Sequence, residues 1–411
     1  MASLTTIEYN DLTQKEPRAN RITFVLNGSR PGGYQGQFLS YARRMAAGHQ
    51  LSIVFVFPVD MGSPIIQEFE SLGVRVHSLG VRARISAKSI FRTYQIFLST
   101  RPQIIHSQHP IAGVNAKIAG WFYKRHEPSV KIICEQRNVP EGLSWIARRL
   151  EYLTFPAADV VLCSSTQVER RYFGSSKVLD PDNFNLDRRK HYTFYNSIDT
   201  DFAAAAKVEA HQSRAFLKRE WGIESGDFVF VTVAKFTKQK DYPTLISGFA
   251  KARQMAPGRT LKLICVGDGP EMAPIQGLAQ RQCIEAHVIF AGYRADVPRI
   301  LSGVDCFVLT SLWEGLPKAL LEAMAIPLPC VATEVSGTED VIRHEVDGIL
   351  IPPADATACA SALVRVVEDQ SLCQTLKARA SERVASFSAK RQVEVLLRLY
   401  DQLHVSAMKV T

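Results

Sequence analysis

The sequence predicts an α/β protein of two domains, each built on a parallel β-sheet. Short runs rich in Val, Ile and Leu alternate with helical patterns along most of the chain. Strands that are apolar on both faces are typical of parallel sheets covered by helices on both sides. With 411 residues, of which 46% are hydrophobic, the chain is long enough for two domains with separate cores.

The predicted strands form two series. The first series lies at residues 22–26, 51–57, 74–79, 104–106, 131–134, 160–163 and 192–195. The second lies at residues 228–233, 261–266, 288–291, 306–309, 330–333 and 349–351. We therefore divide the chain into a flexible tail (1–21), a first domain (22–200), a second domain (201–388) and a final helix (389–411). Ligands in such sheets bind at the carboxyl ends of strands.

Two glutamates bracket residues 314–322, a segment that follows the apolar run 306–309. Pro317 predicts a helix start there, because proline is tolerated at the first helical position, and the free amides of that turn would face an anion. Glu314 can accept hydrogen bonds from sugar hydroxyls, and Glu322 from the two hydroxyls of a ribose. Glycosidase carboxylates lie about 5 to 9.5 Å apart, whereas eight helical positions span about 12 Å, which argues against hydrolysis. The alternative is a core helix with two solvated glutamates.

This segment resembles the paired-glutamate signature of the retaining glycosyltransferases of family 4, which have the GT-B fold. Further segments similar to that family occur in order between about residue 22 and residue 402, at 28–35, 106–109, 195–199, 233–241, 266–271, 292–298, 336–340 and 347–353. The resemblance implies two Rossmann-like domains that face each other across a cleft. It also implies that the final helix crosses back onto the first domain.

The resemblance assigns the donor site to the second domain. Lys235 and Lys240 match two basic residues that hold the donor diphosphate, which are usually Arg then Lys in the family. Glu314 would hold the donor sugar and Glu322 the ribose. The other expected donor-binding residues are Gly32, Gly33, Gly267, Tyr293, Gly315, Leu316 and Pro317.

In the first domain, Gly32 and Gly33 are similar to a glycine loop that faces the donor, and glycines let the backbone approach a phosphate or sugar closely. A plain tight turn is the alternative. Residues 106–109 resemble the His-x-His at the end of the fourth strand, with Gln108 in the second place and His109 after it. Either Gln108 or His109 is expected to contact the donor sugar, and a purely structural role is the alternative.

No metal or other cofactor is expected. The pairs Asp180/Asp182 and Asp199/Asp201 spell the Asp-x-Asp that metal-dependent sugar transferases use, but we interpret both as surface carboxylates. Lys235, Lys240 and a helix N-terminus can neutralise the departing diphosphate instead. The eight cysteines show no zinc-binding spacing.

The net charge of +9 lies wholly in the first half of the chain. Residues 1–200 hold 25 Lys and Arg against 16 Asp and Glu, whereas residues 201–411 hold 24 of each. This excess predicts docking of the first domain on an anionic membrane surface, and nucleic acid is not expected as a partner. We interpret residues 81–100 as a sheet-covering helix with solvated arginines, and an amphipathic membrane-facing helix is the alternative.

The function expected from the sequence is transfer of a hexose, with retention and without a metal, from a UDP- or GDP-linked sugar to an acceptor hydroxyl. The acceptor would be a lipid-linked or growing surface saccharide. No apolar run reaches the roughly 20 residues of a membrane span, so we expect a cytoplasmic protein, with peripheral attachment to the inner face of the membrane left open. The alternatives are a GT-B sugar epimerase or sugar-phosphate synthase, and a non-catalytic nucleotide-sugar-binding homologue.

Overall fold

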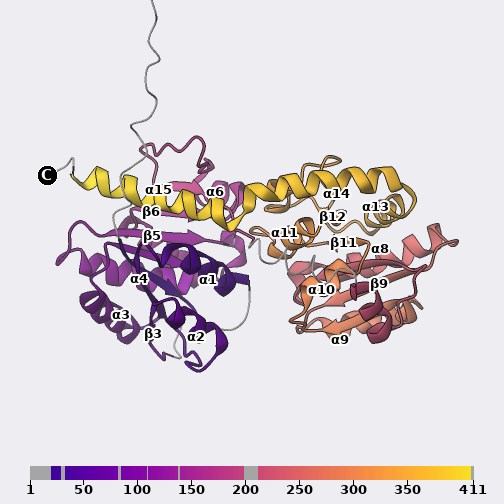
Figure 1. Cartoon of the computed structure of the whole chain (residues 1–411), viewed down its shortest axis with the longest axis horizontal. Helices are drawn as coiled ribbons and strands as arrows, with labels where there is room; N and C mark the ends of the chain where they lie inside the picture. The colour runs from indigo at the N-terminus through magenta and orange to yellow at the C-terminus, as the bar shows by residue number, and fades with distance from the viewer. Residues whose placement is uncertain are drawn as a thin grey trace, which may run out of the picture. The chain divides into compact units, whose positions relative to one another are not determined.

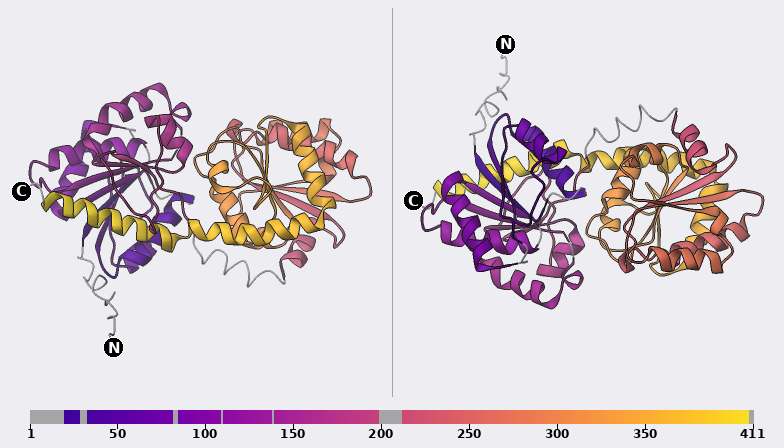
Figure 2. Two further views of the ribbon diagram at one scale, coloured as in Figure 1. Left: turned by 90° about the horizontal axis from the view of Figure 1, so that it is seen from above. Right: turned by 90° about the horizontal axis from the view of Figure 1, so that it is seen from below.

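The computed structural model describes residues 20–28, 33–81, 85–108, 110–137, 139–198 and 212–408. They form two parallel sheets with helices on both faces of each (Figures 1 and 2). The predicted class is therefore confirmed. The predicted tail lies outside the described residues except for Asn20 and Arg21, and so does the predicted domain boundary near residue 200.

The first sheet has the strand order β3-β2-β1-β4-β5-β6-β7. Its strands are β1 (Arg21–Leu26), β2 (Gln50–Phe55), β3 (Arg75–Ser78), β4 (Ile104–Gln108), β5 (Lys131–Gln136), β6 (Val160–Cys163) and β7 (His191–Thr193). β1 pairs in parallel with β2 and with β4, with Phe24 opposite both Ile53 and His106. β1 and β4 are central strands with almost wholly buried side chains, although β4 carries the polar residues His106, Ser107 and Gln108.

Helices connect these strands: α1 (Gly33–Met45), α2 (Pro64–Ser71), α3 (Ala87–Thr100), α4 (Pro110–Tyr123), α5 (Trp145–Thr154) and α6 (Thr166–Phe173). Serines at the start of two of them explain where these helices begin. The Ser86 side chain accepts a hydrogen bond from the Ser89 amide in a capping box, and the Ser165 side chain accepts one from the Val168 amide.

The second sheet has the strand order β10-β9-β8-β11-β12-β13. Its strands are β8 (Phe228–Val233), β9 (Leu261–Val266), β10 (Val288–Gly292), β11 (Cys306–Leu309), β12 (Cys330–Thr333) and β13 (Ile349–Ile351). Successive residues of β8 enter different cores: Phe230 packs on one face of the sheet, and Val229 and Val231 on the other. Both faces are therefore covered.

The helices of this half are α8 (Tyr242–Met255), α9 (Met272–Arg281), α10 (Val297–Ser302), α11 (Lys318–Ala325), α12 (Thr338–Val341), α13 (Ala356–Glu368), α14 (Gln370–Val384) and α15 (Ala389–Met408). The end of α15 packs on the first sheet, where the Tyr400 hydroxyl lies 2.6 Å from His106 Nδ1. The predicted return of the last helix to the first domain is thus present.

Contacts divide the chain into two compact units. One contains Met1–Cys134, Arg149–Asp159 and Tyr400–Thr411, and the other contains Glu135–Arg148 and Val160–Leu399. The second sheet lies wholly within the second unit. Within the described residues, no helix is both long and apolar enough to cross a membrane.

Candidate functional site

Most of the predicted donor-binding residues come together on four neighbouring strands of the second sheet. Lys235 and Lys240 follow β8, Gly267 follows β9, Tyr293 follows β10 and Glu314 follows β11. These strands are adjacent in the order β10-β9-β8-β11, and the pairings of β8 with β9 and β11 and of β9 with β10 are parallel. Their carboxyl ends therefore lie along one edge, the place where such sheets bind ligands.

Glu314 and Lys240 form an ion pair at this edge. Lys240 Nζ donates a hydrogen bond to Glu314 Oε1, and Ser311 Oγ donates to the same oxygen at 2.6 Å. The Glu314 side chain is buried and that of Lys240 mostly so. Charge-assisted hydrogen bonds of this kind fix both groups more firmly than neutral ones do. A lysine ammonium and a carboxylate are thereby held side by side, one suited to a phosphate oxygen and the other to sugar hydroxyls.

Backbone contacts hold the two loops together beside the ion pair. The Leu312 amide donates to the Gln239 carbonyl at 2.8 Å, and the Gln239 side-chain amide donates to the Trp313 carbonyl at 2.7 Å. Thr310 Oγ1 donates to the Lys240 carbonyl at 3.2 Å. The geometry of Lys240 and Glu314 therefore rests on several bonds besides their own contact.

Gly267 lets two loops of this edge approach each other closely. Its φ is +139°, and a Cβ there would lie 2.0 Å from the Ala234 carbonyl oxygen. No side chain fits in that space, so glycine is required by the contact itself. Lys235, the residue after Ala234, is exposed at the end of β8. The close packing of the β9 turn thus positions the backbone that carries Lys235.

Helix α11 begins one residue later than the sequence predicted. Pro317 is the N-cap residue, with φ −73° and ψ 111°, and its carbonyl accepts the first helical hydrogen bond from the Leu321 amide at 3.3 Å. The amides of Lys318, Ala319 and Leu320 form the first turn, where a helix offers unpaired donors and its positive end. The predicted helix start is thus displaced by one residue, to Lys318.

Glu322 lies within α11 with its side chain largely buried. Lys318 Nζ is 3.3 Å from Glu322 Oε1, one helical turn away. Burial raises the pKa of the Glu322 carboxyl, and the nearby Lys318 opposes that rise. A buried carboxylate stabilised by a single lysine is well suited to accept hydrogen bonds from a diol. Leu316, by contrast, is a buried core residue, and the Tyr293 ring is exposed.

Of the residues predicted for the site in the first unit, the structure describes some and not others. Gln108 ends β4 and is buried, at the carboxyl edge of the first sheet. Gly33 begins α1. Gly32 and His109 lie outside the described residues. His106 is a core residue enclosed by Phe24, Phe38 and Tyr400 at ring centroid distances of 5.6, 6.2 and 6.0 Å, which gives it a structural role.

Sequence reasoning missed two polar residues of the second unit that order the loop after β11. Ser311 was not singled out, although it follows a strand and precedes Glu314 by one helical turn in sequence. Asn196 was noted only as part of the segment 195–199, yet its side chain donates to the Leu316 carbonyl at 2.9 Å. Arg137, directly after β5, hydrogen-bonds to Asn196 and to Glu135. Its neighbour Asn138 lies outside the described residues.

Of the two Asp-x-Asp pairs, the structure describes only Asp180 and Asp182. Asp180 and Asp182 both accept hydrogen bonds from Arg391 Nη2, at 2.8 and 2.6 Å. Asp199 and Asp201 lie outside the described residues. No group of three or more His, Cys, Asp or Glu side chains that could hold a metal ion occurs among the residues described.

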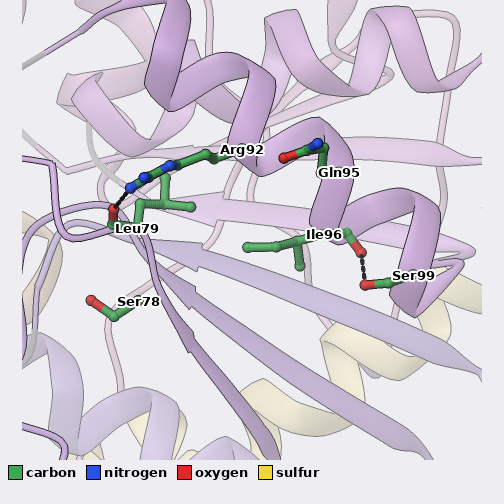
Figure 3. Close-up of a pocket in the computed structure, with 6 residues that line it drawn as sticks. All are labelled: Ser78, Leu79, Arg92, Gln95, Ile96 and Ser99. Atoms are coloured by element: carbon green, nitrogen blue, oxygen red, sulfur yellow. Dashed lines mark hydrogen bonds between the residues drawn. The ribbon is translucent and has the colours of Figure 1, made fainter.

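The helix that the sequence offered as membrane-facing, within residues 81–100, packs on the first sheet. α3 buries Ser89, Thr93, Phe97 and Thr100. Beside it is a hollow of about 270 Å³ lined by Leu79, Arg92 and four further residues (Figure 3). Arg92 Nη1 donates to the Leu79 carbonyl at 2.7 Å across this hollow, as Figure 3 shows. Arg82 and Arg84 lie outside the described residues.

Comparison with known proteins identifies the family. A family described as "Glycosyl transferases group 1" matches residues 213–383, and one described as "Glycosyl transferase 4-like domain" matches residues 32–183. An Escherichia coli protein, UDP-Gal:alpha-D-GlcNAc-diphosphoundecaprenol alpha-1,3-galactosyltransferase, is 32% identical over 327 residues, 78% of this chain and 80% of its own length. The chain belongs to the group 1 glycosyltransferases.

Two further proteins are similar to this glycosyltransferase, one in sequence and one in structure. The N-acetyl-alpha-D-glucosaminyl L-malate synthase of Bacillus anthracis is 33% identical over 192 residues, about half of each chain at 47% and 48%. The crystal structure of Anabaena HepE in complex with UDP and glucose superposes with a TM-score of 0.76 at 19% identity, covering 93% of this chain and 99% of that one. The structural likeness shows that the fold is GT-B.

Proposed function

We propose that this glycosyltransferase moves a hexose from a nucleotide-diphosphate sugar to a hydroxyl of a saccharide acceptor, with retention and without a metal ion. The observation that carries the proposal is the Lys240–Glu314 ion pair at the carboxyl edge of the second sheet. It places a cation for a phosphate next to a carboxylate for a sugar, which is the combination that a nucleotide sugar requires.

The protein supplies positioning and charge to this reaction. The acceptor oxygen forms a bond to the anomeric carbon while the bond from that carbon to the diphosphate oxygen breaks, and the acceptor proton passes to the departing diphosphate. Lys235, Lys240 and the first-turn amides of α11 stabilise the charge that develops on the diphosphate. Glu314 holds the sugar, Glu322 holds the ribose, and Gln108 or His109 contacts the donor sugar.

We favour UDP over GDP as the donor nucleotide. The Escherichia coli relative uses a UDP-linked sugar according to its name, and Anabaena HepE was crystallised with UDP and glucose. A thermal-shift panel with UDP, GDP, ADP and their sugars tests this choice, because a ligand that binds only the folded state raises stability by RT ln(1 + [L]/Kd). Stabilisation by UDP compounds alone is expected, and a response to GDP compounds alone would replace UDP with GDP.

The acceptor is proposed to be a lipid-linked saccharide in the assembly of a surface polysaccharide or lipopolysaccharide. Support comes from the Escherichia coli relative, whose name gives a diphosphoundecaprenol-linked acceptor, and from two Rhizobium meliloti lipopolysaccharide core glycosyltransferases. Such an acceptor favours a cytoplasmic enzyme bound peripherally to the inner face of the membrane. The basic excess of residues 1–200 suits an anionic surface.

Turnover distinguishes transfer from the alternatives. The protein is incubated with the stabilising nucleotide sugar and a short-chain, water-soluble diphosphate-linked saccharide, and products are separated by mass. A new glycoside plus free nucleoside diphosphate supports transfer. An epimer of the donor supports an epimerase, and a phosphorylated disaccharide formed only with sugar phosphate supports a synthase. Binding without any product supports a non-catalytic homologue.

A further inference from the structure

Helix α5 carries its large apolar side chains on the outside. Trp145 is 68% exposed, Ile146 53% and Leu153 67%, and Tyr152 is exposed as well. At 100° per residue these four positions fall on one side of the helix. A helix that packs on a domain normally turns its apolar side inward, so α5 has the reverse arrangement.

The inner side of α5 explains why the helix is held in this orientation. Its one fully buried side chain is Glu151, whose Oε2 accepts a hydrogen bond from Lys117 Nζ of α4 at 2.7 Å. Both side chains are completely buried. Lys117 Nζ also lies 4.5 Å from the centre of the Phe155 ring, just after α5. A buried ion pair cannot turn outward without losing its partner, so the apolar side of α5 stays on the surface.

The end of α4, which the Lys117–Glu151 pair ties to α5, also exposes large apolar side chains. Trp121, one helical turn after Lys117, is 49% exposed, and the Phe122 ring packs edge-on against it at 4.9 Å. The next turn is tied to the chain after α5 by Lys124, whose Nζ lies 2.8 Å from Asp159 Oδ2. The side chains of Trp121, Phe122, Trp145, Ile146, Tyr152 and Leu153 are called here the α4–α5 surface.

The exposed charges of α5, and the one that lies over the aromatic rings at the end of α4, are positive. Arg125 lies over the rings of Trp121 and Phe122, at 4.6 and 5.2 Å from their centres. Arg148 and Arg149 are exposed on α5, and the only acidic residue of that helix is the buried Glu151. Exposed Trp and Tyr side chains lie beside arginines, and the acidic side chain of α5 is buried. This combination complements a membrane with anionic headgroups.

We propose that the α4–α5 surface is the membrane-docking surface of this protein, with its aromatic side chains in the headgroup layer and Arg125, Arg148 and Arg149 on anionic phosphates. The proposal rests on the proposed function in one respect, the lipid-linked acceptor that gives docking its purpose. It replaces α3 with α4 and α5 as the elements that meet the lipid. Binding should combine a salt-sensitive part, from the arginines, with a salt-resistant part, from the apolar side chains.

The first experiment is co-sedimentation with phosphatidylcholine vesicles that contain or lack phosphatidylglycerol. The wild-type protein is expected to pellet with the anionic vesicles at low salt. The double variant Arg148→Glu/Arg149→Glu should lower the partition coefficient at least 25-fold, about fivefold for each arginine removed. The matched control, Arg219→Glu/Lys377→Glu, changes the same charge at exposed positions outside α4 and α5 and should bind like the wild type.

The second experiment locates the contact. Trp121 and Trp145 are two of the four tryptophans in the chain, the others being Trp221 and Trp313. Brominated lipid should quench part of the fluorescence of the wild-type protein. Trp121→Phe/Trp145→Phe keeps the apolar character and should still pellet with vesicles, but its remaining fluorescence should not be quenched. Quenching that persists in this variant would place the membrane contact elsewhere and overturn the proposal.

Two further results would also overturn it. One is equal loss of vesicle binding in the charge-reversal variant and in its control, which would show that binding depends on net charge and not on the position of the arginines. The other is a stable dimer by light scattering that Trp145→Ala makes monomeric while vesicle binding is unchanged, which would assign the surface to a second copy of the chain. None of these measurements uses turnover, so a failure of the proposed transferase activity leaves this test intact. Transfer to a water-soluble acceptor should be unchanged in all the variants.

Discussion

Lys240 and Glu314 are hydrogen-bonded to each other although they lie 74 positions apart in the sequence. The sequence assigned them to different parts of the donor, the lysine to the diphosphate and the glutamate to the sugar. Their contact means that each residue sets the position and the charge of the other. The two functions are therefore coupled, and single substitutions at either position disturb both.

The coupling predicts non-additive effects on activity. Lys240→Ala should lower kcat/KM by about 10²-fold or more, because it removes a cation from the departing diphosphate and leaves Glu314 buried without its partner. Glu314→Gln should also lower kcat/KM, since it weakens the hold on both lysine and sugar. The double variant should lose less than the product of the two single losses, with a coupling energy of about 0.5 to 3 kcal/mol. Wild-type turnover in a folded Lys240→Ala protein would refute the assignment.

Lys235 allows a test of diphosphate binding in which protein stability should not change. Its side chain is exposed, so Lys235→Ala should leave the melting temperature close to that of the wild type. The value of kcat/KM should nevertheless fall by about 10²-fold, as expected for loss of a charge that stabilises a leaving group. Lys238→Ala, a neighbouring exposed lysine, serves as the control and should retain full activity. Equal losses of kcat/KM in both variants would indicate an effect of the overall charge of the loop and not of specific diphosphate binding by Lys235.

Metal removal should not abolish turnover. In the proposed mechanism the neutralising charges come from Lys235, Lys240 and the start of α11. Asp180 and Asp182 are already occupied by Arg391. Initial rates measured after dialysis against excess EDTA should match those of the untreated enzyme. Strict dependence on added Mg²⁺ or Mn²⁺ would restore Asp180 and Asp182 as candidates, and their alanine variants would then be assayed for metal affinity.

Glu322 should show opposite effects on stability and on donor binding. Burial raises the pKa of its carboxyl above the ordinary value of 4.5. A carboxyl whose pKa rises on folding destabilises the protein when it is ionised; this cost is absent below the unfolded pKa and grows as the pH rises through the folded pKa. Glu322→Gln should therefore melt at a higher temperature than the wild type at neutral pH, and the difference should close toward about pH 4.

The same Glu322→Gln variant should bind UDP about tenfold or more weakly, because hydrogen bonds to a charged acceptor contribute about 1.5 to 3 kcal/mol. Titration calorimetry with UDP measures this effect, and uridine serves as the matched ligand, since it keeps the ribose and lacks the phosphates. The loss should appear with both ligands if Glu322 binds the ribose. A loss confined to UDP would move Glu322 to the diphosphate.

The fold could be predicted from sequence because continuous apolar runs, such as β8 and β11, alternate with helical patterns, as in parallel sheets covered on both faces. The donor edge was also predictable, since each candidate residue immediately follows a strand. The partners of these residues were not, because Lys240 and Glu314 meet only when β8 and β11 pair, and Asn196 reaches Leu316 only through the tertiary fold. The start of α11 was misplaced by one residue, since a proline is compatible with both the N-cap and the first helical position.

A related physical reason explains why the reversed orientation of α5 was not predicted. Its sequence is amphipathic, and the usual expectation buries the apolar side. What decides the orientation is Lys117, a residue 34 positions from Glu151 whose charge must also be buried. Breaking this pair should therefore be costly. Lys117→Met, which keeps the length of the side chain, should destabilise the protein by about 3 to 5 kcal/mol, because the buried Glu151 carboxylate loses its lysine partner.

Lys117→Met/Glu151→Leu tests whether charge is the cause. Replacing both partners of a buried pair by apolar residues is often neutral, so the double variant should recover most of the stability lost in Lys117→Met. Urea unfolding at neutral pH measures the free energies of unfolding, and the exposed pair Lys218–Glu224, treated in the same way, provides a control with an expected effect of about 1 kcal/mol or less. If the double variant is as unstable as Lys117→Met, packing and not the buried charge holds α5 in place. In that case the orientation of its apolar side would need another explanation, and the vesicle experiments would be repeated on the double variant to find whether Trp145 still meets lipid.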